Sequence, residues 1–400
     1  MAAAGTPGTP RVLRAMNDRA ALDLLVAHGP LTRTRLGELT GLSKPTASQL
    51  LGRLEAAGLV RATGNVTGRP GPSALLYEVN PGIAHVAALA VDEEGISAAV
   101  ADITGAVLGE HRTRARATDE PGRARTVEQV AEAFTAALGA AGITARDVHR
   151  TVVATHGALD PRTGRLRYAA HLPGWSSLVL PDDLAEATGT PVTIENDVNL
   201  AALAERHEGA ARDCRNFVLL WADEGVGAAV VLGGTLLRGA HGGAGEIGYM
   251  PLPGAPLARG GPETFAGPDA GGGFQMLAGS PAVLRLARAH GIDAATVSEA
   301  LALAAATPGA GEAVLAELAA RLATGLAAVV AVVDPELVVL SGEVCRAGGE
   351  RLRDLVETEL TGLALPRPRL RLSALKEAPV LTGALQVALA DVRDTAFDTA

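Results

Sequence analysis

Cysteine is nearly absent from this 400-residue chain, which holds only Cys214 and Cys345. Two thiols so far apart exclude a disulfide framework and any cysteine-rich metal site. Aromatic residues make up only 2% of the chain, and lysine occurs only as Lys44 and Lys376. The excess of arginine over lysine is typical of coding DNA rich in G and C, so it is weak evidence for a phosphate site.

Long apolar runs are also missing. The run Leu322–Val333 is shorter than the roughly 20 residues that cross a bilayer as a helix, and it ends at Asp334-Pro335. The first ten residues are mostly Ala, Gly, Thr and Pro, without the basic and then apolar pattern of a secretory signal. We therefore expect a cytoplasmic protein that does not contact membranes.

Charge is distributed unevenly along the chain. The net charge is −9, but residues 1–80 carry +4 and the remainder carries −13. A basic module on an acidic body suits one surface that faces a polyanion while the rest is repelled from it. The length predicts two or three domains, and the 48% of apolar residues suffices for several cores.

Three short helices are expected before residue 57. Apolar residues at helical spacing over 13–28 stop at Gly29-Pro30, and a second helix fits Thr32–Thr40. Gly41 permits a sharp turn, and Ser43 is placed to cap a third helix that has Pro45 in its first turn. The apolar side of this third helix consists of Ala47, Leu50, Leu51 and Leu54.

The outward side of the third helix is small, polar and basic, which suits the base edges and phosphates of a major groove. Two strand-like runs, 59–62 and 74–79, flank a turn-rich segment and predict a β-ribbon wing with Arg69 at its tip, suited to a minor groove. The alternative is a small helical bundle whose hairpin binds protein. The predicted DNA-contacting residues are Ser43, Lys44, Thr46, Ser48, Gln49, Arg53 and Arg69.

Strands and helices alternate beyond residue 83, which predicts an α/β body, and the length fits two lobes. Helices are expected over 126–141 and 181–188. Strands are expected over 86–91, 96–102, 151–155, 191–194, 216–221, 227–232 and 337–340.

Several motifs in this body resemble those of the ROK family (repressors, open reading frames, kinases). The matching stretches are Leu172-Pro-Gly-Trp175, Ile194-Glu-Asn-Asp-Val-Asn199, Gly225-Val-Gly227, Gly239-Ala-His-Gly-Gly-Ala-Gly-Glu-Ile-Gly248 and Glu263-Thr-Phe-Ala-Gly267. The winged helix resembles the one found in the family's regulators. The resemblance implies an N-terminal winged helix-turn-helix fused to a two-lobed, actin-like sugar-kinase (ASKHA) fold. We expect a tail over 1–12, the winged helix over 13–80, one lobe over 83–195, the other over 196–380, and a helix near 381–393 that packs back on the first lobe.

The same resemblance implies a sugar site between the lobes. Asn196, Glu246 and Glu263 would contact sugar hydroxyls, and Asp197 stands at the position of the kinases' general base. The plainer interpretation of these residues is an Asn-Asp turn and exposed carboxylates. His171, where the family often has Asn, is a further candidate contact or a structural histidine.

Two departures from the family's kinases concern ATP. The phosphate hairpin is replaced by Asp92-Glu-Glu-Gly-Ile-Ser97, whose acids would repel a triphosphate. The second phosphate loop keeps Gly225, Gly227 and Gly342, but Glu224 precedes the first two. We therefore expect a vestigial nucleotide loop, no use of ATP or Mg²⁺, and no catalytic residue.

A third departure concerns the family's zinc site, which takes one His and three Cys. Tyr249 stands in place of the His, and Pro256-Leu-Ala-Arg-Gly-Gly-Pro262 holds no Cys, so no metal is expected there. Tyr249 offers either a hydroxyl to an effector or a ring to the core.

These observations favour a transcriptional regulator, a repressor rather than an activator, that responds to a sugar or sugar-phosphate effector. The expected partners are a double-stranded DNA operator and further copies of the chain, as a homodimer or a dimer of dimers. Two alternatives stay open: an active sugar kinase with an accessory DNA-binding domain, and a regulator whose sugar site has decayed.

Overall fold

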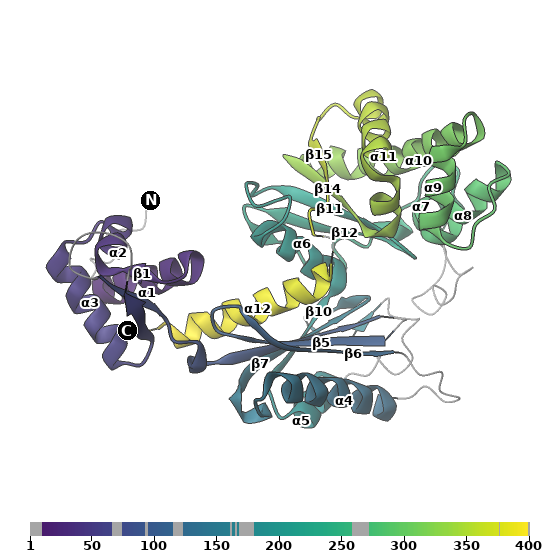
Figure 1. Ribbon diagram of the computed structural model, residues 1–400. Helices are drawn as coiled ribbons and strands as arrows, with labels where there is room; N and C mark the ends of the chain where they lie inside the picture. Colours follow the sequence, from purple (N-terminus) through teal and green to yellow (C-terminus); the bar gives the residue numbers. More distant parts are fainter. Residues whose placement is uncertain are drawn as a thin grey trace.

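The winged helix lies at one end of the molecule and two α/β lobes lie beyond it (Figure 1). The computed structural model describes residues 10–65, 74–92, 95–114, 123–160, 162–164, 166–167, 180–257, 272–375 and 377–398. As predicted, a winged helix-turn-helix precedes an α/β body of two lobes.

The winged helix contains three helices and a three-stranded sheet of order β1-β3-β2. Its helices pack with their apolar sides inward, and Leu22, Leu36 and Leu50 are at most 1% exposed. The elements are α1 (Pro10–His28), β1 (Leu31–Thr32), α2 (Arg33–Thr40), α3 (Lys44–Ala56), β2 (Val60–Asn65) and β3 (Leu75–Val79).

The first lobe is built on a five-stranded sheet of order β10-β7-β4-β5-β6. Helices α4 and α5 pack on one face of it, and α12 packs on the other face against β4 and β7. The elements are η1 (Pro81–Ile83), β4 (His85–Val91), β5 (Gly95–Asp102), β6 (Val107–Arg114), α4 (Arg123–Ala141), η2 (Ala145–Asp147), β7 (Val148–Thr155), β8 (Ala158–Leu159), β9 (Leu166–Arg167), α5 (Leu180–Thr188), β10 (Val192–Asn196) and α12 (Pro379–Ala396).

The second lobe repeats this plan, with a sheet of order β13-β12-β11-β14-β15. In each lobe the first strand pairs antiparallel with the second and parallel with the fourth. The elements are α6 (Asp197–His207), β11 (Phe217–Ala222), β12 (Val226–Leu232), β13 (Thr235–Leu236), η3 (Ile247–Tyr249), α7 (Gln275–Ala278), α8 (Ser280–Ala289), α9 (Val297–Ala306), α10 (Ala310–Val333), β14 (Leu337–Ser341), α11 (Gly342–Leu363) and β15 (Arg369–Leu372).

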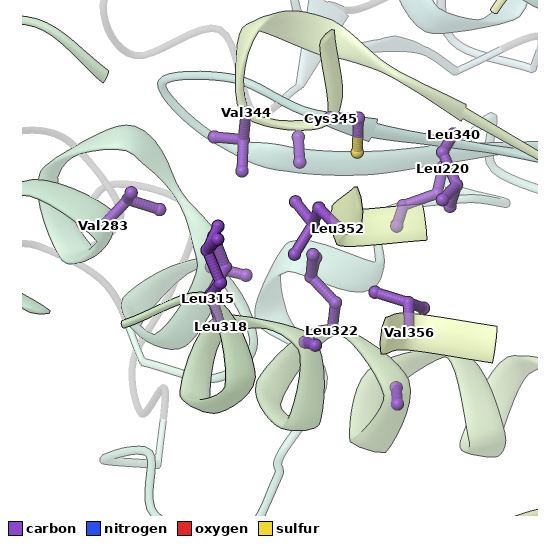
Figure 2. Close-up of a cluster of buried hydrophobic side chains, with 14 of the residues drawn as sticks. Leu220, Val283, Leu315, Leu318, Leu322, Leu340, Val344, Cys345, Leu352 and Val356 are labelled. Atoms are coloured by element: carbon purple, nitrogen blue, oxygen red, sulfur yellow. The ribbon is translucent and has the colours of Figure 1, made fainter. Parts of the chain in front are cut away.

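Helix α10 is long and apolar enough, by length and composition alone, to cross a membrane. In the fold it is a core helix. Leu315, Leu318 and Leu322 point toward Leu352 and Val356 of α11 and toward the sheet (Figure 2). A helix that is apolar on most of its sides is buried in the core of a large domain, which accounts for its composition.

The winged helix and the first lobe share one hydrophobic core. Leu22 and Leu50 belong to the same buried cluster as Val86 of β4, Leu389 of α12 and Phe397, the C-cap of α12. Helix α12 also packs along α6 of the second lobe. The C-terminal helix therefore contacts all three parts of the molecule.

Candidate DNA-binding surface and interlobe site

Local capping and a buried apolar side set the position of α3. The Ser43 hydroxyl accepts a hydrogen bond from the Thr46 amide at 3.4 Å, as a helix N-cap does. Gly41 has a φ of +70° at the end of α2, a conformation that glycine adopts without strain. Ala47, Leu50, Leu51 and Leu54 are each about 1% exposed, so the opposite side of α3 faces outward.

The predicted contact residues of α3 mostly lie on this outward side. Lys44, Thr46 and Gln49 are exposed, and Ser48 is half-buried. Arg53 differs, because its Nη2 donates to Oδ1 of Asp18 at 2.7 Å, and the Asp18 side chain is only 7% exposed. Arg53 therefore ties α3 to α1. Arg69, predicted at the tip of the wing, lies outside the described residues.

Asn196 and Asp197 lie where the chain passes from the first lobe to the second. Asn196 ends β10 and caps α6, since its side-chain oxygen accepts from the Asn199 amide at 3.0 Å. Its Nδ2 donates to the Gly157 carbonyl at 2.9 Å. Asp197 is buried, and its Oδ1 accepts from the Val198 amide at 2.8 Å. The sequence analysis left open an Asn-Asp turn at these two residues. In the structure Asn196 is the N-cap of α6, at the carboxyl end of the parallel strand β10.

His156 is a member of this site that the sequence analysis missed. Its Nδ1 lies 2.8 Å from Oδ2 of Asp197, and its side chain is 37% exposed. His156 directly follows β7, which pairs parallel with β10, so the two strands end at one edge of the sheet. The predicted strands 151–155 and 191–194 were the signal that could have pointed to this histidine.

Glu246 lies beside Asp197, on the glycine-rich segment that precedes η3. Burial, and then the negative charge of Asp197, raise the pKa of Glu246 to about 7. This segment lies directly against the backbone of neighbouring parts of the chain. A Cβ at Gly245 would overlap the Ala228 carbonyl oxygen, and a Cβ at Gly242 would overlap the Leu159 carbonyl oxygen. Tyr249 is half-buried at the end of η3, whereas the predicted contacts His171 and Glu263 lie outside the described residues.

Further polar side chains from the two lobes lie close together near this site. Arg238, which follows β13, donates through Nε to Oε2 of Glu195 on β10 at 2.7 Å. His241 lies 3.9 Å from the buried Asp160. The interlobe site, defined here as His156, Asn196, Asp197 and Glu246, therefore combines carboxylates, an amide and an imidazole, which are groups that hydrogen-bond hydroxyls.

At the loop that was predicted to be a vestigial nucleotide loop, one carboxylate of the chain contacts the start of α11. Gly342 starts α11 and fits only without a side chain, because a Cβ there would overlap the Ala222 carbonyl oxygen. The next amide, of Glu343, donates to Oδ2 of Asp223 at 3.3 Å. Burial raises the pKa of Asp223. An amide at a helix N-terminus, which would otherwise suit a phosphate, here contacts a carboxylate of the protein.

The residues present do not fit the zinc ion that the family resemblance implies, which would need one His and three Cys. Residues 256–262 hold no Cys, and Tyr249 stands where the resemblance places the His. Among the described residues, no group of three or more His, Cys, Asp or Glu side chains is arranged to hold a metal ion.

Residues 88–390, well over half of the chain, match the model of the ROK family. The chain belongs to the ROK family. Residues 16–69 match the MarR family, so this ROK protein carries a winged helix of MarR type before its two lobes.

The relatives of this ROK protein include kinases and regulators. A glucokinase of Halalkalibacterium halodurans is 29% identical over 53% of this chain and 66% of its own length. The DNA-binding transcriptional dual regulator NagC of Escherichia coli is 22% identical over 61% of this chain and 59% of its own length. The chain thus covers less than two thirds of either relative.

Solved structures agree on the fold. A ROK hexokinase from Thermus thermophilus is 32% identical, with a TM-score of 0.63, over 78% of this chain and 99% of that one. A ROK family transcriptional regulator, a homologue of the Escherichia coli MLC protein, is 22% identical with a TM-score of 0.73. That second likeness covers 97% of this chain and 100% of the regulator, winged helix included.

Proposed function

We propose that this ROK protein is a cytoplasmic transcriptional repressor whose affinity for DNA changes when a sugar or sugar derivative binds at the interlobe site. The observation that carries the proposal is the outward side of α3. Lys44, Thr46 and Gln49 are exposed on a helix whose other side is fully packed. Small polar and basic groups in this arrangement suit a major groove.

The effector would bind through groups that already make hydrogen bonds. The carboxylate of Asp197 and the amide of Asn196 each contact protein atoms, yet each keeps a further lone pair or N–H for a ligand hydroxyl. Glu246, with a pKa of about 7, can donate as well as accept near neutral pH. A ligand that touches both lobes affects DNA binding only if it prefers one arrangement of them.

The loss of kinase activity is part of the proposal. Its support is the carboxylate of Asp223, which accepts from the Glu343 amide at the loop where a kinase would bind phosphates. In addition, Oδ2 of Asp197, the carboxylate at the general-base position, is engaged by His156. The competing function, an active sugar kinase, is favoured by the presence of Asp197 and by the glucokinase relative.

Fluorescence anisotropy on DNA fragments that flank the gene, with D-glucose, D-xylose and N-acetyl-D-glucosamine as probes, tests the proposal. We expect the anisotropy of one fragment to rise as the protein binds it, and its affinity to change at least about fivefold with one sugar. Failure to bind any fragment at low salt would refute it. A coupled ATP-hydrolysis assay with the same sugars separates the two functions, since clear turnover would favour the kinase.

Assembly into a homodimer is part of this proposal as well. One winged helix buries a small area on DNA, so two of them on paired half-sites give the affinity that a repressor needs. Light scattering of the purified chain, alone and on an operator fragment, measures the number of copies. A monomer in both states would contradict it.

A further inference from the structure

Helix α12 connects the interlobe site to the winged helix (Figure 1). Its 18 residues span roughly 27 Å at 1.5 Å per residue. Between its ends it packs on β4 and β7, and its buried side chains belong to the core shared with α1 and α3. A helix held along its length in this way moves as a rigid body.

The end of α12 near the interlobe site is in tight contact with α6. A Cβ at Gly383 would overlap the carbonyl oxygen of Leu200, so the two helix backbones touch. Leu200 lies three residues after Asp197, in the first turn of α6. At this point no side chain lies between the two backbones, so a shift of the first turn of α6 pushes directly on α12.

At the other end of α12, Arg19 of α1 adds polar contacts to the apolar core that the two helices share. Nη2 of Arg19 donates to Oδ1 of Asp394 at 2.7 Å, and the guanidinium lies 5.7 Å from the ring centre of Phe397. Phe397 is 1% exposed, so this end of α12 is anchored in the core. A surface groove of about 480 Å³ runs beside the contact, so solvent screens the ion pair and it can rearrange at low cost.

The residue before Arg19 on α1 contacts α3. Asp18 accepts the hydrogen bond from Arg53, so two adjacent residues of α1 bind the C-terminal helix and the proposed DNA-reading helix. No other ion pair between the described residues of the winged helix and those of α12 is seen.

We propose that α12 transmits the state of the interlobe site to α3, and that Asp18 and Arg19 form the joint at which it does so. The inference rests on the proposed function for its purpose, but the mechanical coupling can be measured without an effector. Effector binding would shift the first turn of α6, α12 would follow as a rigid rod, and the joint would change the position of α3.

The first experiment perturbs one end and measures the other. In the full-length chain, Gly383→Ala should force α12 away from α6 and raise amide hydrogen exchange in α1 and α3 about fivefold. Gly139→Ala in α4 is the matched control, because its Cβ would meet nothing within 4 Å, and it should leave α3 unchanged. Unaltered exchange in α3, with altered exchange in α12, would overturn the coupling.

The second experiment breaks the joint, and it also serves if Gly383→Ala fails to fold. Arg19→Gln should abolish the change in DNA affinity caused by the active sugar, while the affinity for that sugar shifts less than about twofold. Asp394→Asn should have the same effect. A variant with both substitutions should lose no more of the sugar-dependent change in DNA affinity than either single variant does. Arg11→Ala, which removes an exposed arginine on the same helix, is the control.

A sugar response that survives in Arg19→Gln would contradict the role of Arg19 in the joint. Absence of DNA binding in the unaltered chain contradicts the proposed function instead, and the exchange experiment still decides the coupling.

Discussion

The polar residues of α3 and those of the interlobe site differ in what they contact. Lys44, Thr46 and Gln49 face solvent, and among the described residues their side chains make one hydrogen bond, the local one between the hydroxyls of Thr46 and Ser43. Asp197 and Glu246, by contrast, are largely buried beside groups of the same chain. The first set is built for an external partner, whereas the second must exchange internal contacts for external ones.

This difference sets how each region should respond to change. An exposed polar group adds little to stability, so its removal acts on binding. A buried carboxylate contributes a pH-dependent term to the free energy of unfolding, so its removal acts on stability first. Substitutions on the outward side of α3 should therefore change DNA binding, whereas substitutions in the interlobe site should first change stability.

The largest effect is expected at Glu246. Its pKa of about 7 in the fold lies above the ordinary 4.5, so the folded state holds a proton that the unfolded state has lost between these pH values. The free energy of unfolding should thus fall by about 3 kcal/mol as the pH rises from 4.5 to 7. Glu246→Gln should remove this slope and stabilise the protein at pH 7.5. Urea unfolding followed by tryptophan fluorescence measures it.

The control for this prediction is Glu359→Gln, which alters an exposed carboxyl on α11 and should keep the slope of the parent chain. An unchanged slope in Glu246→Gln would mean that Glu246 is ionised in the fold at pH 6, and the interlobe site would then lack its proton donor.

Lys44 and Gln49 should differ from each other on DNA. Gln49→Ala should reduce the preference for the operator over random duplex by about 1–3 kcal/mol, because an amide on the outward side of α3 can read a base edge. Lys44→Ala should weaken binding to both duplexes and lower the salt slope by about one unit, as the loss of a phosphate contact does. Anisotropy titrations at several salt concentrations measure both. Equal effects of the two variants on both duplexes would place α3 outside the major groove.

The two regions also differ in how far they could be predicted from sequence. The side of α3 follows from the spacing of Ala47, Leu50 and Leu54 and from a cap three residues before Thr46, all within one helix. In the interlobe site, Asp197 was predicted from a family motif. Its partner His156 directly follows a different strand, β7, and the carboxylate of Asp223 accepts from the Glu343 amide, 120 positions away in the sequence. Pairs of that kind depend on the sheet order, which local periodicity does not contain.

Composition hid other parts of the fold. Helices α9 and α10 consist mainly of Ala, Leu, Val and Glu, so their sequence separates a buried from an exposed side only weakly, and no helix was predicted there. For Arg53, in contrast, the sequence predicted the position of the side chain but not its partner. Its place on the outward side of α3 was predicted correctly, but its partner Asp18 comes from α1 and only the packing of the two helices brings them together.

Arg53 lies between the two regions in character, since it is exposed but holds a buried carboxylate. Arg53→Ala should leave Asp18 without its ion pair and lower the free energy of unfolding by about 1–2 kcal/mol, a value reduced for the 42% exposure of the arginine side chain. Asp18→Asn should cost less, and the double variant should cost no more than Arg53→Ala alone. Thermal and urea unfolding measure the cycle. Strictly additive losses would show that the pair contributes nothing.

The smallest effect is expected at the start of α3. Ser43→Ala removes the acceptor for the Thr46 amide and the hydroxyl partner of Thr46 at 2.8 Å, so it should cost about 1 kcal/mol of stability. Ser48→Ala, on the same helix but away from the cap, should change stability by less than about 0.5 kcal/mol. Because Lys44 is the first residue of α3, fraying of this turn should also weaken DNA binding, and it should do so to the same degree on operator and random duplex. A loss confined to the operator would instead mean that Ser43 itself contacts a base.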